Sequence, residues 1–404
     1  MPCGYGLVLA IQAALRRLQI HLARLQHKLC ARVRVDRQHR EMAASIDFAL
    51  WKYLPARLLH SIPPIRRDID DNAAHAVVGW KLDRRLERRG RLGVVFMARS
   101  ADAAQAETPT AYSSVLVVEK QQGKHNFSGV RAINRLLGTL ERLTAGTHPH
   151  VCQLLSACHT PLRLYVNMYM AGRHSLRHLL SRRDLPAKGA PPRSLRRDVV
   201  RSIASQVCAA VGHLHLAARV SHGSISPEAF SVNQAGDGQV RVMLGCFDMA
   251  ALAASDEMCH AFTGALPHAA PEALVRDLEG FDGMGADMWS VGVTFLEMCC
   301  GLGCIEEALS KRGESLALAA CSGGCAETPA PPLAEEAAEP FRRALRDPGL
   351  LGGLFAAQDE AEADRGPNFM RPYILGLVEV STRRRLTTQR MLHLMPLEPT
   401  ARAR

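Results

Sequence analysis

The chain has 404 residues, 47% apolar and 22% charged, which is the balance of a folded globular protein and not of a disordered one. No run reaches the roughly 18 uninterrupted apolar residues that a membrane-spanning helix needs, so we expect a protein that is soluble or attached to a membrane surface. The formal net charge is +11, but residues 1–40 hold eight lysines or arginines against a single acid, Asp36. Because the basic character belongs mainly to this segment, we expect no nucleic-acid partner.

The first segment, residues 1–43, is predicted to form a basic amphipathic helix. Its apolar residues recur at steps of three or four and share one stripe: Ile11, Leu15, Leu18, Leu22, Leu25, Leu29 and Val33. Three interpretations remain open: a helix on a membrane surface, an arginine-rich transit peptide, or a helix docked on its own domain or a partner. Flotation with anionic liposomes, with and without residues 1–43, distinguishes the first.

Residues 44–77 are predicted to be a linker, because Pro63-Pro64 excludes a continuous helix. Residues 78–398 then change from short apolar runs, with strands expected at 94–96 and 115–118, to helix-like periodicity from about Leu176. One amphipathic helix is expected from the stripe Ile203, Val207, Val211 and Leu214. This order predicts an α+β protein with a small β-rich N-lobe (78–171), a larger helical C-lobe (172–398) and a short tail (399–404).

Twelve cysteines are scattered along the chain, with a loose group at Cys299, Cys300 and Cys304. No pair of CxxC motifs stands at zinc-ribbon spacing, so we expect no metal site. Reduced, buried thiols are the expected state, and disulfides remain open if the chain is secreted.

Motifs of phosphate chemistry begin with Gly90 and Gly93, followed by Val95, which resemble the second half of a glycine-rich loop. Glycine lets the backbone approach phosphate oxygens closely. Val117-Val118-Glu119-Lys120 follows, with Lys120 at the end of an expected strand, where a lysine can pair with nucleotide phosphates. His148-Pro149-His150-Val151 and the apolar run at 164–170 come next.

The most informative stretch is His222-Gly223-Ser224-Ile225-Ser226-Pro227-Glu228-Ala229-Phe230. Four more matches follow in order: Leu244-Gly245-Cys246-Phe247-Asp248, Ala270-Pro271-Glu272, Asp287-Met288-Trp289-Ser290-Val291-Gly292, and Arg385-Leu386. Their order and spacing over about residues 78–395 resemble the protein kinase superfamily. The resemblance implies a bilobal kinase-like fold with ATP between the lobes.

The residues that carry chemistry in that family are replaced here. Ser224 stands where the family has its catalytic aspartate, and Ser226 stands at the loop lysine. Ala229 and Cys246 stand at the two Mg²⁺ ligands, although Mg²⁺ prefers hard oxygen ligands. Leu136 falls where the glutamate partner of Lys120 is expected. The resemblance therefore implies a degenerate site in which Mg²⁺ binding is not expected.

The residues with structural roles in that family are retained. By resemblance, His222 and Phe247 stack in the core between the lobes, and Asp287 holds the backbone of the catalytic loop. Glu272 and Arg385 correspond to a buried ion pair of the larger lobe.

Two functions follow from this pattern. The first is a pseudokinase that acts as a scaffold or allosteric regulator of a protein partner, such as an active kinase or its substrate. In that reading Gly90, Gly93, Val95 and Lys120 can still hold ATP without metal. The second is a divergent Ser/Thr kinase whose metal ligands have moved to Asp248 and Glu228.

A narrower resemblance concerns the N-terminus. An arginine-rich amphipathic helix ahead of a degenerate kinase domain, with Gly223 after His222, is similar to the rhoptry kinases and pseudokinases of apicomplexan parasites. In that family such helices attach the protein to the vacuole membrane. The resemblance implies that residues 1–40 bind a membrane surface.

Overall fold

The structure is a computed structural model, and part of the chain is described in it. The described residues are 76–77, 80–89, 94–100, 112–119, 136, 138–140, 142–143, 146–159, 163–181, 195–234, 239–252, 266–274, 280–312, 343, 347–361 and 368–395. The predicted N-terminal helix (1–43), almost all of the predicted linker, Gly90, Gly93, Lys120 and the tail (399–404) lie outside these residues.

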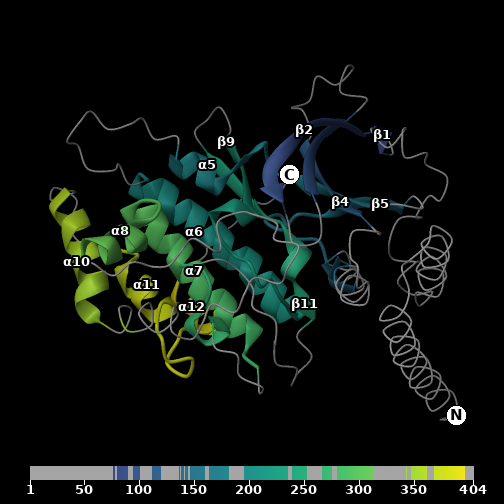
Figure 1. Cartoon of the computed structure of the whole chain (residues 1–404). Helices are drawn as coiled ribbons and strands as arrows, with labels where there is room; N and C mark the ends of the chain where they lie inside the picture. The colour runs from purple at the N-terminus through teal and green to yellow at the C-terminus, as the bar shows by residue number, and fades with distance from the viewer. Residues whose placement is uncertain are drawn as a thin grey trace, which may run out of the picture.

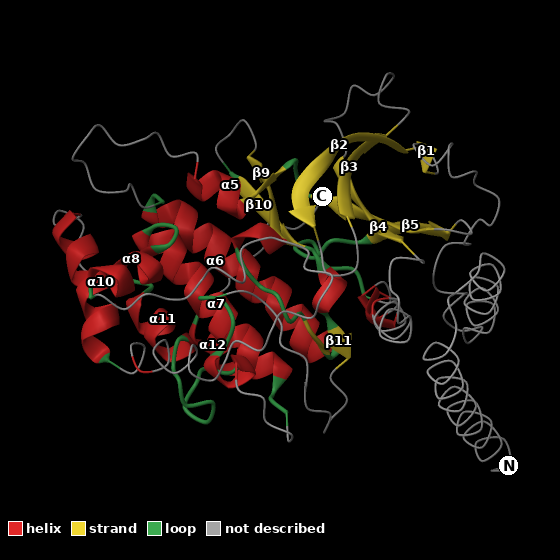
Figure 2. Ribbon diagram, in the orientation of Figure 1, coloured by secondary structure: helices red, strands yellow, loops and turns green. Residues whose placement is uncertain are grey.

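An antiparallel sheet forms one side of the molecule (Figures 1 and 2). Its order is β1 (Ala76–Val77), β2 (Trp80–Arg89), β3 (Val94–Ser100), β4 (Tyr112–Glu119), β6 (Arg163–Met170) and β5 (Leu154–His159). The predicted strands at 94–96 and 115–118 are confirmed in β3 and β4, where β-branched and apolar residues favour the pleated backbone. Strand β1 lies inside the segment predicted to be a linker, so the end of that segment was predicted wrongly. Val77 pairs with Trp80, and the two strands form a hairpin.

Helices make up most of the other side (Figure 2). They are α5 (Leu176–Ser181), α6 (Arg197–Gly212), α7 (Gly283–Cys300), α8 (Cys304–Lys311), α10 (Pro348–Ala361), α11 (Arg371–Leu377) and α12 (Thr388–Leu394). Short strands lie among them: β7 (His174–Ser175) and β10 (Val240–Leu244) flank β9 (Phe230–Gln234), and β8 (Val220–Ser221) pairs with β11 (Ala251–Leu252). The predicted α+β class is confirmed, although the sequence analysis did not anticipate these short strands.

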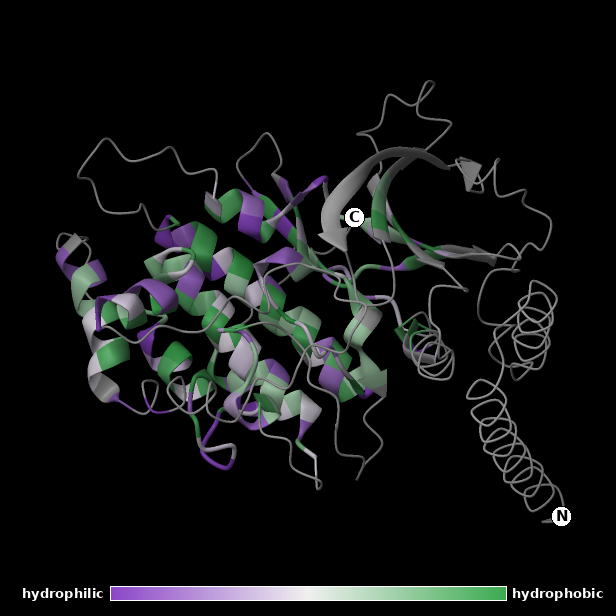
Figure 3. Ribbon diagram, viewed as in Figure 1, coloured by the Kyte–Doolittle hydropathy of each residue, from purple (hydrophilic) through white to green (hydrophobic). Residues whose placement is uncertain are grey.

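Helix α7 is the centre of the core. Every residue from Ala286 to Cys299 is buried, which is the pattern of a helix covered on all sides. Figure 3 shows hydrophobic ribbon along α6 and α7 in the interior of the helical part. The helix begins where the side chain of Asp282 accepts a hydrogen bond from the backbone N–H of Met284 at 3.0 Å.

The stripe predicted along α6 is confirmed. Ile203, Val207 and Val211 are fully buried, and they pack in the same core cluster as α7. After Gly212 the helix widens into a π-helical turn, η2 (His213–Ala218), which keeps Leu214 buried and ends at Arg219 in the left-handed region (φ 56°). A π turn changes which side chains face the core, and such turns often occur at functional sites. In η2 the side chains of His213 and His215 contact different neighbouring residues.

Substitution at Gly172, in the connection from β6 to β7, should destabilise the chain. A Cβ there would lie 2.1 Å from the carbonyl oxygen of Val232, so the backbone of β9 would have to shift. We expect Gly172→Ala to lower the free energy of unfolding by about 1–3 kcal/mol. Gly352→Ala in α10 is the control: nothing lies within 4 Å, and alanine favours a helix by about 1 kcal/mol. Equal urea midpoints for the two variants would contradict this.

Among the described residues, no single helix is long and apolar enough to cross a membrane. Within this part of the chain, one bent pair, α7 and α8 with an angle of 79° at their junction, would together meet that length and apolarity.

Candidate functional site

The loop after β8 is held by one buried carboxylate. Asp287, on α7, accepts hydrogen bonds from the backbone N–H of His222 at 2.6 Å and of Gly223 at 2.8 Å. Gly223 has a φ of 74°, a conformation that suits glycine. A single aspartate on the most buried helix therefore determines the backbone conformation immediately before Ser224.

A buried histidine supports that carboxylate. The Nε2 atom of His215 lies 3.0 Å from Oδ2 of Asp287, and its Nδ1 atom lies 2.6 Å from Oγ1 of Thr388. This link was not predicted from the sequence. The sequence shows His215 only as a histidine at the end of an amphipathic helix. Its two partners could not be identified there, because they lie 72 and 173 residues away along the chain.

Ser224, Ser226 and Ala229 lie together on the segment from this loop into the 3₁₀ turn η3 (Pro227–Ala229). Ser224 is 8% exposed, and its hydroxyl oxygen has no hydrogen-bond partner among the described residues. The backbone N–H of Ala229 donates to the carbonyl of Ser226, and the Ala229 carbonyl accepts from Gly245 at 2.8 Å. This last bond joins the segment to the one that carries Cys246.

Cys246 precedes the 3₁₀ turn η4 (Phe247–Met249) and has a left-handed backbone (φ 63°, ψ 52°). Left-handed backbone is uncommon outside glycine, asparagine and aspartate. The ring of Phe247 packs edge-on against His222, with centroids 5.3 Å apart, and Nε2 of His222 hydrogen bonds the Gly245 carbonyl at 2.7 Å. Ala229 and Cys246 thus stand on adjoining segments, where neither side chain offers the oxygen ligand that Mg²⁺ requires.

A second thiol lies beside this position. Cys152 is fully buried, and a Cβ on Gly245 would be 3.0 Å from its sulfur. Burial, followed by the neighbouring Cys246, raises the pKa of Cys152 to about 12. Cys152 is therefore a neutral thiol at physiological pH, and it adds no anionic ligand to the site.

Some of the residues predicted to lie at the ATP-binding part of the site belong to the described residues, and others do not. Val95, on β3, is half-buried and packs against the core. Leu136 is 2% exposed in the same core, so the position expected to hold an acid contributes an apolar contact instead. Gly90, Gly93, Lys120 and the side chain of Asp248 lie outside the described residues.

Glu272 and Arg385 meet in the helical part. The guanidinium of Arg385 donates to both carboxylate oxygens of Glu272, at 2.5 and 2.9 Å, and also to the carbonyls of Gly285 and Glu379. It lies over the ring of Trp289, 5.3 Å from the centroid. The Arg385 side chain is 2% exposed, so the pair is largely withdrawn from water.

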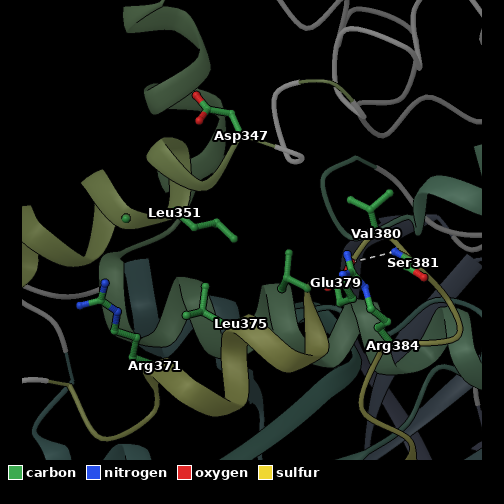
Figure 4. A pocket seen from close by; sticks show the side chains of 10 residues that line it. Asp347, Leu351, Arg371, Leu375, Glu379, Val380, Ser381 and Arg384 are labelled. Carbon is green, nitrogen blue, oxygen red and sulfur yellow. Dashed lines mark hydrogen bonds and ion pairs between the residues drawn. The ribbon is translucent and has the colours of Figure 1, made fainter.

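A cavity of about 630 Å³ opens elsewhere, between α10, α11 and the loop that follows α11 (Figure 4). Leu351, Val378 and the partly exposed Leu375 supply apolar wall. Charged groups on the rim of the cavity already form ion pairs: Arg384 lies 3.4 Å from Glu379, and Asp347 pairs with Arg312. The cavity shares no residue with the positions predicted from the sequence.

A family model for the protein kinase domain matches residues 89–393. The chain therefore belongs to the protein kinase domain family. It is 30% identical over 221 residues to a CBL-interacting protein kinase 19 of Oryza sativa subsp. japonica, covering 54% of this chain and 38% of that protein. It is 27% identical over 254 residues to a CBL-interacting serine/threonine-protein kinase 19 of Arabidopsis thaliana, covering 61% and 46%.

A fission yeast relative is similar over a shorter range. Serine/threonine-protein kinase ppk25 of Schizosaccharomyces pombe is 30% identical over 167 residues, covering 41% of this chain and 34% of that protein. The chain thus spans less than half the length of the curated relatives that it matches here. The family supports ATP as the general ligand of the fold.

Proposed function

We propose that this protein is a pseudokinase, a kinase-fold protein that works through binding and not through phosphoryl transfer. The observation that carries the proposal is the joint presence of Ser224, Ala229 and Cys246 at the family's base and metal positions. Around them the Asp287 contacts to the loop backbone are intact. A serine hydroxyl is no base near neutral pH, and alanine and cysteine are poor Mg²⁺ ligands.

Known magnitudes indicate how large the loss is. A positioned general base contributes typically 10²–10⁴ in rate, and metal ions contribute several kcal/mol of transition-state stabilisation. Protein kinases turn over at roughly 1–100 s⁻¹. Losing both contributions reduces the expected transfer to near background.

Transfer of labelled phosphate from Mg²⁺–ATP to a general protein substrate tests the proposal. We expect a rate near background that Lys120→Ala leaves unchanged. A rate within the roughly 1–100 s⁻¹ range of protein kinases, abolished by Lys120→Ala, would overturn it.

ATP is proposed to bind without a metal ion, through Val95, Lys120 and the glycines at 90 and 93. We expect ATP to raise the melting temperature by the same amount with Mg²⁺ and with EDTA, because Ala229 and Cys246 add no metal contact. Saturation at about 100 times Kd corresponds to about 2.7 kcal/mol of stabilisation. Lys120→Ala should reduce the shift. A shift seen only with Mg²⁺ contradicts metal-free binding, and no shift at millimolar ATP contradicts nucleotide binding.

A protein partner is proposed as the target of regulation, either an active kinase or its substrate. Two of the relatives above carry names that describe them as CBL-interacting, so in those proteins a kinase domain occurs together with a protein-binding function. The expected signature is a partner kinase whose rate changes on adding this chain, equally with the Lys120→Ala variant. A change that disappears with Lys120→Ala points instead to activity of this chain.

The alternative is a divergent Ser/Thr protein kinase, which the names of the relatives favour. Its metal would be held by Asp248 and Glu228. Glu228 forms an ion pair with Arg177 at 3.0 Å, so it would have to exchange that partner for the metal. Mg²⁺-dependent ATP turnover that is lost in Asp248→Ala supports the alternative, and turnover indifferent to Mg²⁺ counts against it.

A further inference from the structure

Three histidine rings meet where the loop at residues 146–151 contacts the helical part. The rings of His148 and His213 are stacked, with centroids 5.0 Å apart and an interplanar angle of 19°. His150 lies edge-on to His148 at 5.7 Å. His213 is the first residue of the π turn η2, so the stack joins the loop to the turn that also carries His215.

The hydrogen bonds require His148 to be neutral. Its Nδ1 atom accepts from the backbone N–H of His150 at 3.2 Å, and a protonated Nδ1 cannot accept. The Nδ1 atom of His150 lies 3.0 Å from the Val242 carbonyl. The Nε2 atom of His213 is buried and has no hydrogen-bond partner within the described part of the chain.

The charged surroundings disfavour a proton as well. From the loop, His148 and His150 face each other; from η2 the neighbour is His213; from β10 it is Arg241, which also donates to the Pro149 carbonyl. Among the described residues, no carboxylate contributes to the pKa shift of His148 or of His150. Burial first, then His213 and His150, lower the pKa of His148 from 6.5 to about 4.

The same loop is tied by its backbone to the segment that leads to Cys246. The N–H of Leu244 donates to the His150 carbonyl at 2.9 Å, and the N–H of Cys152 donates to the Leu244 carbonyl at 2.8 Å. Val151 and Leu244 form a parallel bridge. Release of the loop therefore loosens the backbone two residues before Cys246.

We propose that His148, His150 and His213 form an acid-sensitive latch that is closed while His148 is neutral and that opens the contact between this loop, η2 and β10 when His148 takes up a proton. Imidazole is the side chain whose charge changes between pH 5 and 8, and histidine clusters act as pH switches in this way. The latch depends on neither the catalytic positions nor nucleotide binding.

The direction of the pH effect follows from linkage. A ring with a pKa of 6.5 when released and about 4 when stacked binds protons preferentially in the open state. The stabilisation that the neutral ring gives the closed state is complete above about pH 7.5 and declines progressively below about 6.5. Between pH 7.5 and 5.5 the opening equilibrium grows by up to about tenfold for one such ring, and by less where solvent screens it.

Hydrogen exchange of the full chain, corrected for intrinsic rates, tests the latch at the amides of Cys152 and Leu244. We expect protection to fall by up to about tenfold between pH 7.5 and 5.5. His148→Gln should remove most of the fall, because glutamine does not titrate, and His213→Gln should reduce the fall, because it removes the ring that stacks on His148. His393→Gln, at an exposed site on α12, is the matched control and should keep the whole fall. Equal protection at both pH values, or an undiminished fall in both latch variants, overturns the proposal.

Ring titration followed by NMR gives a readout that does not depend on how the variants fold. In the folded wild-type chain the His148 Cε1–H resonance should remain that of a neutral ring at pH 5.5. A His148 resonance that titrates with a pKa near 6.5 in the folded chain would contradict the proposed latch.

Discussion

Restoring three side chains together, through Ser224→Asp, Ala229→Asn and Cys246→Asp, is expected to raise phosphoryl transfer at least about 100-fold above the rate of the natural chain. The substitutions return a general base and two oxygen ligands for Mg²⁺, and the base alone is worth typically 10²–10⁴. The backbone suits the change at position 246, because aspartate tolerates the left-handed conformation that Cys246 adopts. The measurement is the initial rate of labelled phosphate transfer from Mg²⁺–ATP.

The restored variant needs two controls. Adding Lys120→Ala to the triple variant should remove the gain, since the lysine pairs with the nucleotide phosphates in this family. Cys246→Asp alone should make the ATP-induced thermal shift depend on Mg²⁺, which can be read even if the triple variant folds poorly. If the natural chain transferred phosphate as fast as the triple variant, the residues at positions 224, 229 and 246 would not be what limits the reaction.

Arg385→Ala is expected to lower the free energy of unfolding by about 3–5 kcal/mol, because it leaves the carboxylate of Glu272 without its charged partner in a mostly buried place. The guanidinium also donates to the carbonyls of Gly285 and Glu379, so two backbone acceptors lose a partner as well. Urea denaturation at neutral pH measures the change. A loss this large approaches the whole stability of many domains.

The neighbouring residue supplies the matched control. The side chain of Arg384 is 75% exposed and lies 3.4 Å from Glu379, so Arg384→Ala should change stability by no more than about 1 kcal/mol. Similar losses for the two variants would show that burial of the Arg385–Glu272 pair does not explain its effect.

Short-range patterns in the sequence correctly predicted several strands and helices of this fold. The β-branched runs at Val94 and Val115 predicted β3 and β4, and the four-residue spacing of Ile203, Val207 and Val211 predicted α6. Both predictions depend on the repeat of side-chain direction within one element, which neighbouring residues express by themselves. The short strands β7, β9 and β10 were missed, because pairings of two to five residues leave little periodicity to read.

The family assignment also came from order along the chain. Motifs that are weak singly, such as Gly90 to Val95 or Arg385-Leu386, became informative because they follow one another at consistent spacing. The family model over residues 89–393 supports that assignment. The same motifs identified which positions depart from the family, and so the amino acids alone raised the question of catalytic loss at Ser224, Ala229 and Cys246.

Contacts between distant segments could not be read in this way. The bonds of His215 to Asp287 and Thr388, the stack of His148 on His213, and the packing of Cys152 against Gly245 each join segments that are at least 65 residues apart. Such contacts depend on how the helices and strands close on one another, and a histidine in a sequence looks the same whether its ring is stacked, hydrogen bonded or exposed. Residue identity and spacing sufficed for the family and for the proposal that its catalytic residues are replaced. The support of the loop and the proposed latch emerged only from packing, because burial and distance are properties of the folded chain.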